Sequence, residues 1–196
     1  MKNILKIGAL GSLVLFGLAA AAAGQVSSDP PTVASVDLDR YTGRWYEIAK
    51  YPNKFQKQCV ANTVATYKKK PNGRLEVVNE CLRSDGTKNT AVGEAKITKG
   101  SNNTKLKVRF APGFLSFLSA VWGDYWVIDL GREYEYAVIG EPKREYLWIL
   151  SRKPEMGDAL YQQILRRVET LGFVPSRVER TRQQATVLKG TVTGSD

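Results

Sequence analysis

The sequence predicts an all-β fold: an eight-stranded antiparallel up-and-down barrel, with one α-helix packed outside it and a short ninth strand. Three observations support this prediction. Short runs rich in Val, Ile, Thr, Tyr and Trp recur at roughly ten-residue spacing, turn signals separate them, and one amphipathic segment follows the last run. The chain of 196 residues is long enough for one domain with a sizeable core.

The N-terminal segment has the pattern of an export signal. Lys2 and Lys6 precede an uncharged run over residues 7–23 that ends in small residues, as cleavable signals do. We assign residues 1–23 to a signal peptide, with an uncleaved membrane anchor as the alternative. An exported chain would be periplasmic or associated with the outer membrane in a bacterium, and secreted elsewhere. Residues 24–36 are small and polar, which predicts a disordered leader before a domain over 37–183 and a polar tail over 184–196.

The barrel strands are predicted from their composition and from the turns between them. The clearest alternation lies in residues 105–110, where Lys and Arg alternate with Leu106, Val108 and Phe110. One face of this strand is therefore expected to be exposed to solvent and the other to be apolar. Turn signals lie at 71–73, 84–86, 100–103 and 141–145. The predicted strands span residues 44–51, 59–69, 74–82, 89–98, 104–111, 124–130, 135–141 and 146–152.

A helix is expected to cover part of this barrel, because the runs 125–130 and 146–150 are apolar on both faces. Asp158 is placed to cap this helix, Gly172 to end it, and a final short strand is expected over 177–183. Its apolar stripe consists of Leu160, Tyr161, Ile164, Leu165, Val168 and Leu171.

Composition argues against several classes of function. The net charge is +10, but the basic residues are dispersed along an exported chain, so we expect no nucleic-acid partner. The sequence contains no histidine, which removes Ser-His and Cys-His nucleophile pairs and histidine metal sites. It also lacks a Gly-rich phosphate loop and EF-hand spacing. We therefore expect no enzyme, no cofactor and no metal.

The stretch "GRWYEIAKYP", residues 43–52, resembles the lipocalin family, whose first strand carries a Gly-x-Trp-Tyr motif. The resemblance implies that Gly43, Trp45 and Tyr46 close one end of the barrel, with the Arg152 guanidinium against the Trp45 ring in a cation–π contact. The runs "GDYWVIDL" and "YEYAVIGEPKREYLWILSR" are similar to bacterial outer-membrane lipocalins, plant temperature-induced lipocalins and apolipoprotein D. The family's Asp between strands six and seven falls at Gly131, so we expect a variant turn there, with Asp129 two residues earlier.

The resemblance implies that the protein carries or stores a small hydrophobic or amphiphilic ligand of the fatty acid or lysophospholipid class. Core filling is the alternative role for any one inward-facing residue. Lys54 and Lys57, in the loop after the first strand, are candidates for an anionic headgroup, or simply solvated charges. The inward-facing candidates for ligand contact are Val77, Leu106, Val108, Phe110, Trp148 and Leu150.

The two cysteines, Cys59 and Cys81, are each eleven positions from Lys70 at the bend between the second and third strands. This symmetry places them opposite one another at the open end, where a disulfide would brace the mouth. The alternative is a free thiol that acts as a nucleophile, in a lipocalin-fold enzyme acting on a lipid or a carotenoid-like ligand.

The loop over residues 112–122 is unusually apolar for a connection at the open mouth. It would either fold inward as a lid or touch a membrane surface, where basic residues would help. A barrel filled by its own side chains, acting in membrane attachment or as a homodimer, is a third hypothesis. The loop residues expected to rim the entrance are Phe114, Leu115, Phe117, Leu118 and Trp122.

Overall fold

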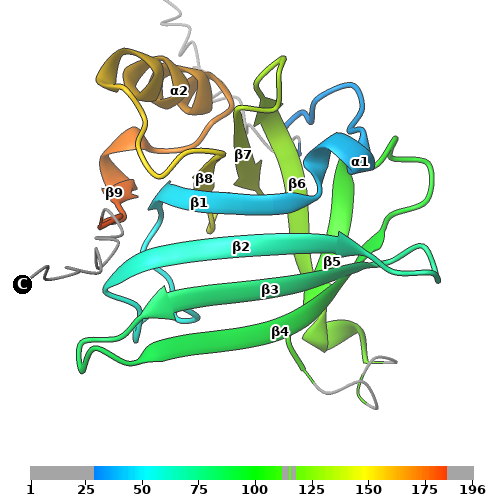
Figure 1. Ribbon diagram of the computed structural model, residues 1–196. Helices are drawn as coiled ribbons and strands as arrows, with labels where there is room; N and C mark the ends of the chain where they lie inside the picture. The colour runs from blue at the N-terminus through cyan, green and yellow to red at the C-terminus, as the bar shows by residue number, and fades with distance from the viewer. Residues whose placement is uncertain (1–28, 112–114, 116–117, 185–196) are drawn as a thin grey trace, which may run out of the picture.

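The protein forms a closed β-barrel with a helix against its outer wall (Figure 1). The computed structural model describes residues 29–111, 115 and 118–184. In this part of the chain, eight strands follow one another antiparallel, and β1 also pairs with β2 so that the sheet closes. The predicted fold class is confirmed. The strands are β1 (Gly43–Lys50), β2 (Ala61–Lys69), β3 (Leu75–Leu82), β4 (Lys88–Ile97), β5 (Lys105–Arg109), β6 (Gly123–Leu130), β7 (Tyr136–Gly140) and β8 (Trp148–Ser151).

Alternation along the strands divides the apolar side chains between two clusters. In β6, Tyr125 and Val127 belong to the cluster inside the barrel, whereas Trp126 and Ile128 pack outside it. Helix α2 (Asp158–Thr170) covers the outer cluster, which explains why this strand is apolar on both faces. The helix buries Tyr161, Ile164 and Val168 there.

The start of α2 differs from the prediction. The N-cap residue is Gly157, and no side chain caps the helix. Asp158 is already the first helical residue, and its carboxylate accepts a hydrogen bond of 2.6 Å from Arg180 in the short ninth strand, β9 (Glu179–Arg180). The predicted stop is confirmed, because Gly172 adopts a positive φ of 82° just after the helix.

The segment before the barrel also differs from the prediction of disorder. Residues 29–36 lie against the barrel: the Val33 amide donates to the Val127 carbonyl over 3.0 Å, and the Val36 side chain is buried. Asp37 then caps the short helix α1 (Leu38–Tyr41) through its side chain. The apolar residues of this segment find partners that local composition does not reveal. The rest of the predicted leader lies outside the described residues.

The turn between β6 and β7 is built around Gly131. A side-chain carbon at this glycine would lie 2.3 Å from the Glu135 carboxyl group, so no larger residue fits without a shift. Glu135 accepts a hydrogen bond of 3.0 Å from the Glu133 amide. Asp129 instead accepts from the Tyr136 hydroxyl. The carboxylate of this variant turn is therefore supplied by Glu135.

The C-terminal residues complete the barrel wall at its open end. β1 pairs with β2 over Gly43–Tyr46. Beyond this point the Thr181 amide donates to the Ile48 carbonyl, and the Arg182 carbonyl accepts from the Asn62 amide at 2.8 Å. The predicted final strand thus exists, shorter than expected, and the residues after it bridge β1 and β2. Short 3₁₀ helices span Ser119–Val121 (η2) and Pro175–Arg177 (η3).

Candidate functional site: the cavity at the open end of the barrel

The barrel contains a cavity of about 690 Å³ that opens at one end. Because successive strands alternate in direction, the β1–β2, β3–β4, β5–β6 and β7–β8 loops surround the same mouth. Residues of all four of these connections or their flanks line the cavity, among them Phe55, Cys81, Val121 and Tyr146. A cavity of this size is within the range of small-molecule sites.

Most of the residues expected to contact a ligand line this cavity. Val108 and Phe110 come from the end of β5, and Phe110 lies directly over Gly93, where a side-chain carbon would meet its ring at 2.6 Å. Leu106 differs, because it is 2% exposed and belongs to the cluster beneath the cavity. The lining members of the predicted set are Val77, Val108, Phe110, Trp148 and Leu150.

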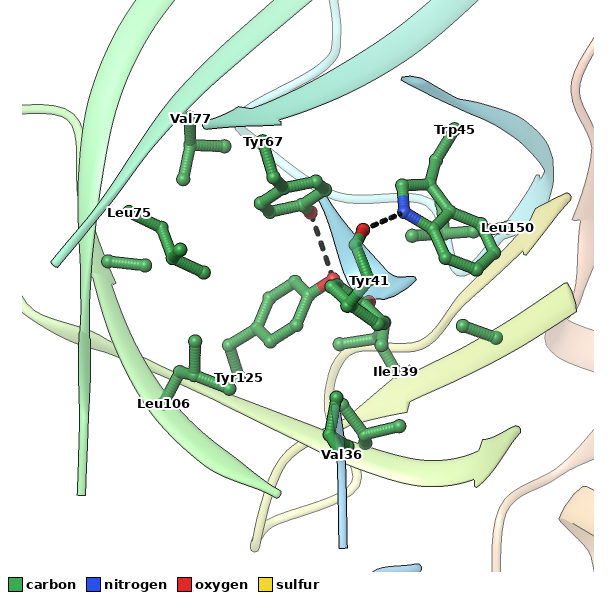
Figure 2. Packing of buried hydrophobic residues seen from close by; sticks show 13 residues of the cluster. Val36, Tyr41, Trp45, Tyr67, Leu75, Val77, Leu106, Tyr125, Ile139 and Leu150 are labelled. Atoms are coloured by element: carbon green, nitrogen blue, oxygen red, sulfur yellow. Dashed lines mark hydrogen bonds between the residues drawn. The ribbon is translucent and has the colours of Figure 1, made fainter. Parts of the chain in front are cut away.

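The floor of the cavity carries two tyrosines that the sequence analysis missed. Tyr67 and Tyr125 both line it, and their hydroxyl oxygens are 2.9 Å apart (Figure 2). The Tyr125 hydroxyl also lies 2.6 Å from that of Tyr41. Alternation places Tyr67 and Tyr125 on the inner face, but nothing in the sequence shows that their hydroxyls meet.

Below these tyrosines, Trp45 and Arg152 close the barrel. The Trp45 ring is fully buried and its Nε1 donates to the Tyr41 carbonyl over 2.8 Å, while the Arg152 guanidinium carbon lies 3.8 Å from the ring centroid. Gly43 adopts a φ of 92°, a backbone conformation that other residues rarely adopt, and lies next to the Arg152 guanidinium. Tyr46 lies elsewhere: it packs against the outer cluster covered by α2. Tyr46 therefore does not plug the closed end.

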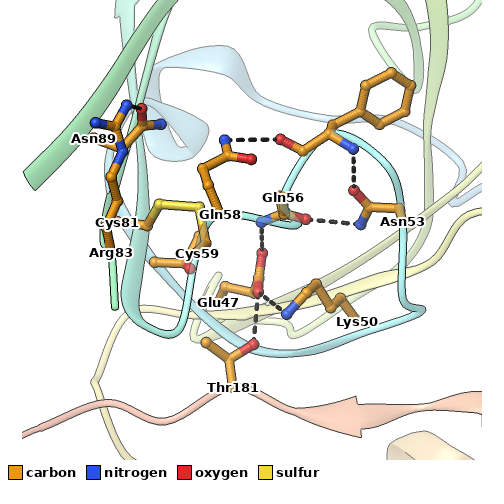
Figure 3. Close-up of a disulfide and its surroundings, with 12 residues drawn as sticks. Glu47, Lys50, Asn53, Gln56, Gln58, Cys59, Cys81, Arg83, Asn89 and Thr181 are labelled. Atoms are coloured by element: carbon orange, nitrogen blue, oxygen red, sulfur yellow. Dashed lines mark hydrogen bonds and ion pairs between the residues drawn. A yellow bond between two sulfur atoms is a disulfide. The ribbon is translucent and has the colours of Figure 1, made fainter. Parts of the chain in front are cut away.

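At the mouth, the buried carboxylate of Glu47 links three segments (Figure 3). It accepts hydrogen bonds of 2.6 Å from the Gln56 side chain and from the Thr181 hydroxyl. Gln56 in turn accepts from the Trp148 indole at 2.9 Å, which ties the β1–β2 loop to β8. Glu47 is two residues after Trp45 and so lies on the same, inward-facing side of the strand. A carboxylate on this apolar face needs partners, and this feature of the sequence could have indicated the network.

The two predicted headgroup lysines are placed differently. Lys54 lines the cavity, with its ammonium nitrogen 5.5 Å from the centroid of the Phe55 ring. Lys57 is exposed and is not among the lining residues. Lys143, in the β7–β8 connection, also lines the mouth and was not predicted. Lys54 and Lys143 are therefore the two lysines among the described residues that line the cavity.

Arg109 at the cavity edge is already paired with a carboxylate. Its guanidinium lies 3.0 Å from Glu94, which also pairs with Lys70 and Arg74. Burial raises the pKa of Glu94, but the hydrogen bonds from these three cations outweigh it and lower the pKa to about 2. Glu94 is therefore ionised at neutral pH and pairs with Arg109, while the cluster of three cations and one carboxylate keeps a net positive charge.

The predicted disulfide is present between Cys59 and Cys81, with their Cα atoms 5.5 Å apart (Figure 3). It joins the start of β2 to the end of β3, and both cysteines line the mouth of the cavity. The described residues include no free cysteine. The alternative of a nucleophilic thiol at the mouth is therefore wrong for this oxidised state.

The apolar loop does connect β5 to β6 at the open end, as predicted. Leu118 is 41% exposed and Leu115 is half-buried, whereas Phe114 and Phe117 lie outside the described residues. Trp122 lines the cavity at this end and is largely covered by its neighbours. It is 9% exposed, with the Lys96 ammonium 4.2 Å and the Arg109 guanidinium 5.1 Å from its ring centroid.

The described residues contain neither a metal-binding cluster nor a membrane-spanning helix. No group of three or more Asp, Glu or Cys side chains there is arranged to hold a metal ion. No helix among residues 29–111, 115 and 118–184 has the length and apolar character needed to cross a bilayer.

Comparison with known proteins agrees with this architecture. The sequence profile of the lipocalin-like domain family matches residues 36–183. Temperature-induced lipocalin-1 of Arabidopsis thaliana is 40% identical over 156 residues, which cover 79% of this chain and 83% of that protein. The outer membrane lipoprotein Blc of Escherichia coli is 36% identical over 156 residues, covering 77% and 84% of the two chains. Apolipoprotein D of Macaca fascicularis is 39% identical over 152 residues, covering 70% and 75%.

A solved structure shows the same fold. Insecticyanin from the tobacco hornworm Manduca sexta superposes with a TM-score of 0.62 at 23% identity, over 79% of this chain and 84% of that one.

Proposed function

Because the chain belongs to the lipocalin family, we propose that it carries or stores one hydrophobic or amphiphilic ligand in its barrel. Members of this family bind small hydrophobic ligands, and the cavity of about 690 Å³ is the observation that carries the proposal here. A barrel filled by its own side chains would leave no such space. The cavity therefore favours a carrier over a protein that only attaches to surfaces.

The polarity of the cavity supports a single-chain lipid, such as a fatty acid or a lysophospholipid. Val77, Val108 and Leu150 surround its inner part, where each buried methylene would contribute about 0.8 kcal/mol before ordering costs. Lys54 and Lys143 at the mouth suit an anionic headgroup. We expect the acyl chain to enter first and the headgroup to remain at the entrance.

Membrane docking through the mouth is part of the proposal. Several apolar side chains on the loops and strand ends around the mouth are exposed, and the excess of basic residues favours anionic lipid. We also propose that the protein is exported, since its N-terminal segment has the signal pattern and one relative is named an outer membrane lipoprotein. The exposed residues are Phe55, Val60, Phe110 and Leu118.

Three observations support a carrier over an enzyme acting on a lipid. The cysteine pair is joined in a disulfide, and the sequence has no histidine with which to activate a hydroxyl nucleophile. The carboxylate of Glu47, which lines the cavity, is also engaged, since it accepts hydrogen bonds from Gln56 and Thr181.

The proposal is tested by blocking the cavity from its wall. Ala91 lines the cavity, whereas its neighbour Val92 points outward and is 61% exposed. We expect Ala91→Phe to weaken binding of palmitic acid and of lysophosphatidylcholine by roughly tenfold or more, or about 1.4 kcal/mol, because the ring would occupy space that the acyl chain needs. Val92→Phe is the matched control and should bind like the wild type. Calorimetry and native mass spectrometry measure both. Failure of the wild-type chain to bind either lipid contradicts the proposal.

A further inference from the structure

The tyrosines at the cavity floor form a chain of three hydroxyl groups. The Tyr67 and Tyr125 oxygens are 2.9 Å apart, and those of Tyr125 and Tyr41 are 2.6 Å apart (Figure 2). Each residue is at most 8% exposed. Apolar side chains surround the chain, among them Val36, Leu75 and Val77. Hydroxyl hydrogens in such surroundings need acceptors, because an unmet hydrogen bond in an apolar interior is costly.

Three hydroxyls supply three donor hydrogens, and two hydrogen bonds between them use two. Among the described residues, no other hydrogen-bond partner reaches any of the three oxygens. One hydrogen is therefore left over, whichever way the chain runs. If Tyr67 donated to Tyr125 and Tyr125 donated to Tyr41, the unused hydrogen would be that of Tyr41. This hydrogen would point into the packed region below the floor, since Tyr41 is 1% exposed and does not line the cavity.

The remaining arrangements send the hydrogen into the cavity. In one, Tyr41 donates to Tyr125, Tyr125 donates to Tyr67, and Tyr67 donates outward. In the other, Tyr41 and Tyr67 both donate to Tyr125, which then donates outward. Tyr67 and Tyr125 both line the cavity, so either arrangement presents one hydrogen-bond donor at the floor.

This donor is neutral and suits a neutral acceptor. Burial raises the pKa of Tyr67 to about 12, although the hydrogen bond with Tyr125 opposes the shift. Burial also raises the pKa of Tyr125 and Tyr41 well above the ordinary tyrosine value, so all three hydroxyls stay protonated at physiological pH. A carboxylate at this depth would exchange its hydration for a single donor, which is unfavourable for a full charge. A ketone or ether oxygen needs only one.

We propose that the floor of the cavity recognises a neutral acceptor oxygen at the leading end of the ligand, through the lining hydroxyl of Tyr67 or Tyr125. This inference rests on the proposed carrier function and narrows its ligand class. The favoured ligand is a hydrophobic chain with a polar head at the mouth and an uncharged oxygen group, such as a ketone, near its buried end.

The experiment compares palmitic acid with its analogue that carries a ketone on the penultimate carbon. The readout is the ratio of their dissociation constants, measured by calorimetry on the full mature chain. We expect Tyr67→Phe/Tyr125→Phe, which removes both lining hydroxyls, to shift this ratio against the ketone by roughly threefold to tenfold, the worth of one hydrogen bond. Palmitic acid, which has no acceptor at this end, reports whether the variant still folds and binds.

Tyr41→Phe is the matched control. It removes the hydroxyl that does not line the cavity, and the remaining pair still has one hydrogen more than it has mutual hydrogen bonds. We therefore expect this variant to keep the wild-type ratio. A wild-type ratio in the double variant overturns the inference and leaves the carrier function standing. Absence of binding of both lipids to the wild-type chain overturns both.

Discussion

The two ends of the barrel are built from similar aromatic residues but are held together differently. At the closed end, Trp45 is fully buried between the Tyr41 backbone and the Arg152 guanidinium, so one side chain makes most of the closure. At the open end, Trp148 is half-buried and depends on Gln56, itself held by Glu47. A buried indole and its cation–π contact hold the first end, whereas a disulfide and a hydrogen-bond network hold the second, which leaves space for a ligand.

We expect the largest effect on stability at the closed end. Replacing Trp45 with Ala should reduce the free energy of unfolding by about 4 kcal/mol, because it leaves a cavity where the structure cannot collapse easily. Urea unfolding followed by circular dichroism measures this. Trp148→Ala is the matched control at the mouth, where a half-exposed ring already borders empty space, and its cost should be clearly smaller. Equal costs at the two positions would contradict the distinction between the ends.

The disulfide is expected to be the next largest contribution. Cys59 and Cys81 are 22 residues apart, and a loop of this length corresponds to about 3 kcal/mol of unfolded-state entropy. The double variant Cys59→Ser/Cys81→Ser should therefore unfold at lower urea concentration. The wild type under reducing conditions should behave like the variant. If removal of the bridge has no effect on unfolding, the mouth is held by other contacts.

The smallest effect on stability is expected for the exposed apolar residues of the mouth. Replacing Phe55 and Leu118 together with Ser should change the free energy of unfolding by less than about 0.5 kcal/mol per site, because both side chains are exposed. The same variant should lose most of its flotation with phosphatidylglycerol vesicles. Val174→Ser is the control, since Val174 is 47% exposed but follows α2 instead of bordering the mouth. Undiminished flotation of the mouth variant would contradict docking through this end.

Local sequence patterns were enough to predict the barrel. Strand alternation in 105–110 places Val108 and Phe110 at the cavity, and the covered face of β6 calls for a helix. The equal distances of Cys59 and Cys81 from one bend give the disulfide, because register in an antiparallel hairpin follows from the turn. The prediction was wrong for Leu106, which lies below the cavity floor. Alternation along a strand shows which residues face inward, but it does not show how deep in the barrel they lie.

The sequence by itself determined the fold class, the position of the mouth and the residues that face inward, because these depend on periodicity and on turns. Only the tertiary structure decided which polar groups meet. Tyr41 and Tyr125, whose hydroxyls meet, are 84 residues apart in the chain, and Gln56 and Trp148 are 92 apart. The centroid of the Trp122 ring lies 4.2 Å from the Lys96 ammonium in β4. Barrel closure brings such residues together, and no local pattern encodes the distance between side chains on strands so far apart in sequence.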